Sequence, residues 1–268
     1  MPELPEVETI RRELQAAVRG KKIEDVRILN AKVVRSPAPA LFRKGITGRT
    51  IRAIHRRAKL LALELSGRKF LTVHLKMTGQ FIYPETSPVK ETRVVFRFSD
   101  KTSLAFRDRR MFGELRLVDD WLALSFVRSL GQEPQDLTQK QFSVLLAGRK
   151  TRIKPLLMDQ TVIAGIGNLY AAEALFRAKI MPDRSAGSLS DKEQSLLFRE
   201  IRATLKEATL HKGSSVDQYV QLTGEPGEYV PYHKVYDRQG QPCRRCKTKI
   251  KRTTLGGRGT YFCPRCQK

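Results

Sequence analysis

The fold of the first half is decided by two neighbouring runs, Lys59-Leu60-Leu61-Ala62-Leu63-Glu64-Leu65 and Phe70-Leu71-Thr72-Val73-His74-Leu75. Both are short, rich in apolar residues, and separated by a break that contains Gly67. Similar apolar or alternating runs recur from Ile23 to Val118, with Gly, Pro and Asp between them. Such spacing is typical of an antiparallel β-sandwich or barrel.

Helical periodicity flanks this β region on both sides. Near the N-terminus, apolar residues recur with a period of about 3.6 residues, at Val7, Ile10, Leu14 and Val18. After Trp121 the same period predicts helices over about 121–130, 138–147, 152–160, 168–180 and 189–211. We therefore expect an α+β protein, with an N-terminal helix and β domain over 1–130, a hinge over 131–137, a helical domain over 138–230 and a tail over 231–268.

The charge of the chain indicates its partner. Among 268 residues there are 51 Lys and Arg against 27 Asp and Glu, which gives a formal net charge of +24. This exceeds what solubility requires and favours a polyanion as partner. No apolar run approaches the roughly 18 residues of a membrane span, and the acidic, proline-broken start is not typical of a signal or transit peptide. We expect a cytoplasmic protein that binds nucleic acid and no membrane.

The four cysteines predict a metal site. They follow the pattern C-x2-C-x16-C-x2-C near the C-terminus, which is typical of a four-thiolate zinc site. Two disulfides are the alternative, but a chain without a secretory signal should keep its thiols reduced. We expect one structural zinc ion and a basic β-hairpin between the two pairs, with these ligands: Cys243, Cys246, Cys263 and Cys266.

The first residues allow two interpretations. Removal of Met1 would leave Pro2 as the N-terminus, a secondary amine that is partly neutral near pH 7. Its attack on a sugar carbon would give a permanently cationic iminium, and Glu3 could supply a proton. A proline and acids at a chain start are equally ordinary helix-start signals.

Four stretches in order, spread over nearly the whole chain, resemble the bacterial formamidopyrimidine-DNA glycosylases, a family in one superfamily with endonuclease VIII. They are Pro2-Glu3-Leu4-Pro5-Glu6-Val7-Glu8-Thr9; Arg56-Arg57-Ala58-Lys59; Gly165-Ile166-Gly167-Asn168-Leu169-Tyr170 with Glu173; and Gly257-Arg258-Gly259-Thr260 in the cysteine hairpin. The resemblance implies a monomeric DNA glycosylase and abasic-site lyase of base excision repair. Its partner would be damaged duplex DNA at the nucleoid, and it would excise 8-oxoguanine and formamidopyrimidines.

The same resemblance implies catalytic roles. Pro2 would be the nucleophile at C1′ of the damaged nucleotide, and Glu3 the acid that assists opening of the sugar ring. Lys59 would donate a proton during β-elimination while it holds a phosphate. Arg258, at the tip of the zinc hairpin, would grip the flanking phosphate and assist δ-elimination.

Further implied roles concern DNA binding. The segment from Ile153 to Ile180 would be a helix–two-turn–helix motif. Asn168 and Lys150 would contact phosphates there, and residues 214–229 would close over the extruded base. The gap in the base stack would be filled by three side chains: Met77, Arg110 and Phe112.

Departures and alternatives remain at this point. The family often has a His-Asp-His stretch, with one His on DNA, where this chain reads Lys90-Glu91-Thr92-Arg93, and Lys90 or Arg93 could substitute for that contact. A second basic residue is frequent in the family where this chain has Met111. An endonuclease VIII-like enzyme for oxidised pyrimidines is the nearest alternative, although Leu4 and the full-length 214–229 segment favour the first branch. A zinc-ribbon DNA-binding protein without catalysis would explain only the charge and the cysteines.

Overall fold

The computed structural model describes residues 1–268 and divides into two compact units. The first unit combines Met1–Arg128 with His211–Glu228, and the second combines Ser129–Leu210 with Tyr229–Lys268. The predicted α+β class is confirmed. None of the helices has the length and apolar character needed to cross a membrane.

Two packed sheets form the body of the first unit, so the sequence alternative of a sandwich is the correct one. In spatial order, the four-stranded sheet holds β1 (Ile23–Ile28), β7 (Thr92–Phe98), β8 (Ser103–Asp108) and β6 (Gly79–Ile82). The five-stranded sheet holds β2 (Val34–Ser36), β9 (Glu114–Val118), β5 (Lys69–His74), β4 (Leu60–Leu65) and β3 (Ile51–Arg57). Neighbouring strands are antiparallel, except that β2 pairs with β9 in parallel.

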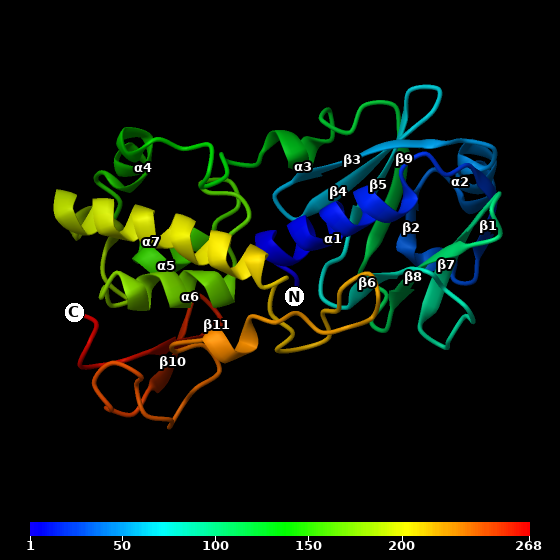
Figure 1. The fold of residues 1–268 in the computed structure, drawn as a ribbon. Coiled ribbons are helices and arrows are strands. Elements are labelled where there is room, and N and C mark those ends of the chain that lie inside the picture. The colour runs from blue at the N-terminus through cyan, green and yellow to red at the C-terminus, as the bar shows by residue number, and fades with distance from the viewer. The chain divides into compact units, whose positions relative to one another are not determined.

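Two helices cover the first unit. Helix α1 (Leu4–Val18) packs along β3 and β4, as Figure 1 shows in dark blue, and buries its apolar stripe in the sandwich core. Helix α2 (Pro39–Ile46) lies in a region that the sequence assigned to strands. Its stripe is only one turn long, with Phe42 and Ile46 buried, so periodicity could not separate it from a short apolar strand.

The second unit is a helical bundle with a β-hairpin. It contains α4 (Gln139–Leu146), α5 (Ile153–Met158), α6 (Asn168–Arg177), α7 (Asp191–Leu210), β10 (Lys251–Leu255) and β11 (Arg258–Phe262). The long helix α7 packs on α4 and α6, and α6 also contacts β11 (Figure 1). Helix α6 is buried from Leu169 to Phe176, which makes it the central element of this unit.

The segment between the predicted domains differs from the sequence expectation. Helix α3 covers only Ser125–Arg128, where a helix over 121–130 was expected. Gly131 donates its N–H to the carbonyl of Gln160 at 2.9 Å, and the carbonyl of Gln132 accepts the N–H of Ala164 at 3.0 Å. The start of the expected hinge is therefore bonded within the second unit.

The structure also divides the chain differently after α7. Residues 211–228 belong to the first unit, whereas the sequence placed them in the helical domain over 138–230. The cysteine tail belongs to the same compact unit as the helices. Each unit therefore contains segments that are far apart in the chain.

Candidate active site

Pro2 and Glu3 lie at the buried start of α1, whereas Met1 before them is exposed. Glu3 is the N-cap residue, and its N–H donates to Oε2 of Glu6 at 2.7 Å. The other oxygen of this buried carboxylate accepts the N–H of Ser214 at 2.9 Å. With Met1 attached, the nitrogen of Pro2 is an amide whose lone pair is delocalised. Nucleophilic chemistry at Pro2 therefore requires removal of Met1.

Lys59 lies in the tight turn that joins β3 to β4, and its side chain is buried at 8% exposure. Burial is rare for lysine unless it has polar partners. Arg56 donates from Nε to Glu8 at 2.9 Å and from Nη1 to the carbonyl of Ala58 at 3.0 Å. Because Glu8 belongs to α1, this ion pair holds the Lys59 turn against the N-terminal helix.

His74 is a neighbour of this turn that the sequence analysis did not select. It ends β5, where it pairs with Leu60, the residue after Lys59. Burial lowers the pKa of His74 to about 4, with a further lowering by the charge of Lys76. Its Nδ1 accepts the N–H of Lys76 at 3.0 Å, so the ring is neutral at pH 7. One histidine within an apolar run gave no signal that separates it from an ordinary strand residue.

The three predicted stack-filling side chains lie together. Arg110 donates from Nη1 to the sulfur of Met77 at 3.3 Å, and its guanidinium lies 4.7 Å from the ring centre of Phe112. Phe112 is 46% exposed, so this group lies at the surface of the first unit. The chain thus presents a preassembled group of one cation and two apolar side chains at the end of β8.

Residues 211–228 dock on the sandwich through backbone atoms. Leu222 donates its N–H to Oε2 of Glu13 on α1 at 2.7 Å, and its carbonyl accepts the N–H of Tyr83 at 2.8 Å. The side chain of Gln80 donates to the carbonyl of Gln218. A cavity of about 490 Å³ lies between this segment and the ends of β6 and β8. Its polar lining includes Thr78, Gln80, Arg109, Asp217 and Gln218.

In the second unit, Asn168 begins α6 and bonds to the cysteine hairpin. Its Nδ2 donates to the carbonyl of Gly259 at 3.0 Å, and its Oδ1 accepts from Nζ of Lys154. Nζ of Lys154 also donates to Oγ1 of Thr260 at 2.8 Å. Lys154 is 1% exposed, so its amino group depends on polar neighbours for hydrogen bonds. Lys154 was not among the residues predicted from the sequence, although a lysine among Ile153, Leu156 and Leu157 is a usable signal of a buried polar side chain.

A second connection in this unit runs through Glu173. This fully buried carboxylate of α6 accepts backbone N–H groups from Lys234, Val235 and Tyr236 at 2.8–2.9 Å. The hydroxyl of Tyr236 consequently lies 3.5 Å from Nδ2 of Asn168. One polar group therefore joins Asn168, Tyr236 and the hairpin. The sequence predicted a role for Asn168 but not for Tyr236.

Arg258 and Lys150 are both exposed. Arg258 begins β11 after Gly256 and Gly257, which both have positive φ, at 53° and 70°. A two-residue turn of this kind requires left-handed conformations at both positions, and glycine adopts them without strain. The structure therefore places Arg258 at the hairpin tip. Lys150 lies in the loop between α4 and α5.

The residues at the two sequence departures have structural partners. Arg93 donates from Nε to the carbonyl of Asp108 at 2.8 Å and from Nη1 to that of Lys90 at 2.9 Å. Met111 packs against the sandwich core with a positive φ of 56°. Arg93 therefore supports the loop that carries Arg110, whereas Lys90 is exposed.

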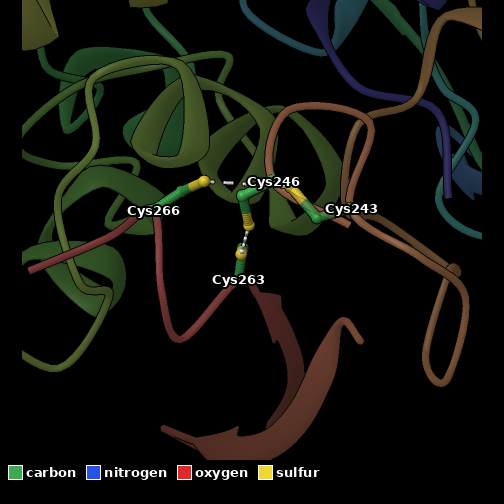
Figure 2. Close-up of side chains that lie close together, drawn as sticks. All are labelled: Cys243, Cys246, Cys263 and Cys266. Carbon is green, nitrogen blue, oxygen red and sulfur yellow. Dashed lines mark hydrogen bonds between the residues drawn. The ribbon is translucent and has the colours of Figure 1, made fainter. Parts of the chain in front are cut away.

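The four cysteines converge in a geometry that fits zinc (Figure 2). All four sulfur atoms lie within 4.8 Å of one another, with separations of 3.9 Å for Cys243–Cys266 and 3.5 Å for Cys246–Cys263. All four cysteines are free, and both separations are far longer than the S–S bond of a disulfide, which is about 2.05 Å. Tetrahedral Zn–S bonds of about 2.3 Å place sulfur atoms about 3.8 Å apart. The donor set is complete, so such an ion would be structural.

Three family models match the chain in order. Residues 1–115 match the formamidopyrimidine-DNA glycosylase N-terminal domain, residues 130–220 match its H2TH domain, and residues 240–268 match the zinc finger found in FPG and IleRS. The chain belongs to the formamidopyrimidine-DNA glycosylase family. It is a DNA glycosylase of DNA repair with a zinc-finger domain.

Relatives of this family match over the full length. The formamidopyrimidine-DNA glycosylase of Pelotomaculum thermopropionicum is 44% identical, covering 100% of this chain and 99% of the relative. That of Geobacillus kaustophilus is 44% identical, with 100% of both chains covered.

Solved structures agree with this assignment. A complex of Lactococcus lactis Fpg mutant G226P with Fapy-dG-containing DNA has a TM-score of 0.92 at 34% identity, with 100% of both chains covered. The MutM (Fpg) protein of Thermus thermophilus has a TM-score of 0.89 at 38% identity, covering 99% of this chain and 98% of that one.

Proposed function

We propose that this formamidopyrimidine-DNA glycosylase excises oxidised purines, 8-oxoguanine and formamidopyrimidines, and then cleaves the DNA strand at the resulting abasic site. The observation that carries the proposal is the buried start of the chain, where the N–H of Glu3 is bonded to Glu6 on α1. The ion pair between Arg56 and Glu8 holds the Lys59 turn against the same helix. Solved complexes of Lactococcus lactis Fpg with Fapy-dG-containing and abasic-site DNA support the formamidopyrimidine and abasic-site parts of this proposal.

Excision begins once Met1 has been removed. The free amine of Pro2 attacks C1′ of the damaged nucleotide, a new N–C1′ bond forms, and the glycosidic bond breaks with its electron pair leaving on the base. The positively charged nitrogen gives its N–H proton to the departing base. The lone pair thus freed forms a C=N bond as C1′–O4′ breaks, and Glu3 gives its proton to O4′. The product is an iminium that joins Pro2 to the opened sugar.

Strand cleavage follows from this iminium. Loss of a proton from C2′ allows the C3′–O bond to break with release of the 3′ phosphate, and Lys59 transfers protons and holds the phosphate there. In a second elimination a proton leaves C4′ and the C5′–O bond breaks, which releases the 5′ phosphate that Arg258 grips. Water then hydrolyses the iminium and regenerates the amine of Pro2.

DNA binding is assigned to both units. Lys150 and Asn168 contact phosphates, the latter at the N-terminus of α6, where backbone N–H groups favour anions. One zinc ion held by the four cysteines keeps the hairpin of Arg258 folded. Met77, Arg110 and Phe112 occupy the space of the extruded base, and residues 214–229 close over that base. We propose that the protein acts as a monomer, because one chain supplies every assigned residue. Its DNA substrate places it at the nucleoid in the cytoplasm.

Borohydride trapping tests the reaction class. Protein with a free Pro2 amine should form a covalent adduct with an 8-oxoguanine duplex, and mass spectrometry should map the adduct to Pro2. A DNA-binding protein without catalysis gives no adduct, and an adduct on a lysine contradicts the proposed nucleophile. A panel of 8-oxoguanine, formamidopyrimidine and thymine glycol duplexes tests the substrate, because preference for thymine glycol would place the chain with the endonuclease VIII-like enzymes.

A further inference from the structure

Asp108 is a buried carboxylate at the end of β8, with 1% exposure. Its Oδ2 accepts the N–H of Gly113 at 2.7 Å, and its Oδ1 accepts the N–H of Arg110 at 3.2 Å. These two bonds span the loop from 108 to 113. One side chain therefore joins the beginning and the end of the loop that carries Arg110 and Phe112.

The same carboxylate reaches the neighbouring loop through Thr78. The hydroxyl of Thr78 donates to Oδ1 of Asp108 and accepts the N–H of Arg110 at 3.0 Å. Thr78 directly follows Met77, whose sulfur contacts Arg110. Asp108 and Thr78 thus connect both loops that supply the exposed group of Met77, Arg110 and Phe112.

The backbone of this loop needs such a connection. Met111 has a φ of 56°, a left-handed conformation that is unfavourable for a residue with a side chain. A Cβ atom at Gly113 would lie 2.9 Å from Oδ2 of Asp108 and 2.6 Å from the ring of Phe106. The loop therefore closes tightly around the carboxylate, and a buried carboxylate that accepts backbone N–H groups is a strong anchor.

We propose that Asp108 is a positioning residue that fixes Met77, Arg110 and Phe112, before DNA binds, in the arrangement that fills the emptied base stack. This inference rests on the proposed function, in which Met77, Arg110 and Phe112 fill the gap left by the extruded base. Its physical basis is preorganisation: side chains that are already ordered lose less entropy on insertion into DNA.

Asp108→Asn tests the proposal, because an amide in this place directs an N–H group at the N–H of Gly113 or Arg110. Excision of 8-oxoguanine from duplex DNA should fall roughly ten- to hundredfold, since small misplacements have effects of this order. Trapping on a single-stranded abasic oligonucleotide should stay within about twofold of the parent protein, because no base stack has to be filled.

Three controls separate positioning from folding. Glu85→Gln alters another buried carboxylate beside the same sheet, bonded to Arg107 at 2.7 Å, and should leave the ratio of the two activities unchanged. Thr78→Val, which lacks the hydroxyl, should show part of the loss of duplex excision seen with Asp108→Asn. Thr78→Ser, which keeps the hydroxyl, should retain the excision activity of the parent protein. A 2-aminopurine base beside the lesion should report weaker unstacking with Asp108→Asn.

The outcomes are distinct. Wild-type duplex excision and fluorescence with Asp108→Asn would overturn the positioning role. A parallel loss of both activities that follows the loss of folded protein would also overturn it, and would make Asp108 a stabilising residue only. If the parent protein itself neither traps nor excises, the proposed function fails, whatever Asp108 does.

Discussion

Glu3 combines two roles at the start of α1, the N-cap of the helix and the proposed acid, and substitution separates them. Glu3→Gln keeps the size of the side chain but removes its proton. We expect loss of 8-oxoguanine excision with retained cleavage at a preformed abasic site, where no glycosidic bond remains. If Glu3 only capped the helix, the variant would lose at most about 2 kcal/mol of stability and little activity.

Pro2→Gly complements this test at the nucleophile. The variant, once Met1 is removed, carries a primary amine that still forms a Schiff base but is less firmly positioned than the proline ring. Borohydride trapping should persist at a reduced level, whereas base excision should be largely lost. Unchanged excision kinetics would contradict the assignment of Pro2 as nucleophile.

Glu8 gives the first unit an acid-sensitive stability. Burial acts to raise its pKa, but hydrogen bonds from Arg11, Arg56 and Arg12 outweigh burial and lower the pKa to about 2. The carboxylate therefore stabilises the fold fully above its ordinary pKa of 4.5, and this contribution is lost as the pH falls from 4.5 toward about 2. Urea unfolding should show the stability difference between the parent and Glu8→Gln shrinking over that range.

Glu13 on the same helix is the matched control of opposite sign. Burial raises its pKa above 4.5, against the hydrogen bond from Leu222. Its contribution to stability is therefore largest at low pH and falls as the pH rises through its folded-state pKa. The same pH trend for Glu8→Gln and Glu13→Gln would contradict one of the two assignments.

Lys154 links three elements of the second unit, α5, α6 and β11. Lys154→Met keeps the length of the side chain but leaves Asn168 and Thr260 without their buried donor. Each unsatisfied group costs about 1–3 kcal/mol, so thermal unfolding of the second unit should shift down, and DNA affinity should fall with it. Lys179→Met, at an exposed position, is the control and should leave both unchanged.

The hairpin of β10 and β11 depends on its metal, since four thiolates around zinc supply folding energy that a stretch this short lacks. Chelation, or Cys246→Ser, should abolish DNA binding, while hydrogen exchange in the sandwich strands stays slow. Metal analysis of active protein should find one zinc per chain. Active protein without zinc would refute the structural role.

For the whole molecule, the net charge of +24 predicts steep salt dependence of DNA binding. Lys150→Ala should lower the slope of log affinity against log salt by about 0.9, the value for one phosphate contact. It should weaken lesion-containing and undamaged duplexes alike, as measured by fluorescence anisotropy at several salt concentrations. A loss confined to the lesion duplex would argue against a phosphate contact.

Short-range patterns in the sequence determined much of this protein. The period-2 runs predicted the sandwich strands, and the cysteine spacing predicted the hairpin and its metal ligands. Each of these features depends on residues that are neighbours in the chain, so composition and spacing record them directly. The resemblance then added roles for Pro2 and Glu3, which helix-start signals alone left open, and a role for Lys59.

Only the tertiary structure decided how distant segments are held. It assigned residues 211–228 to the first unit, through Glu6 and Glu13, and it bonded the hairpin to α6 through Lys154. It also bonded the Asp108 carboxylate to the backbone of Arg110 and Gly113. Most of these bonds join a side chain to backbone N–H or C=O groups, which nearly every residue carries. A backbone partner cannot be identified from residue types, so these bonds are visible only in the folded structure.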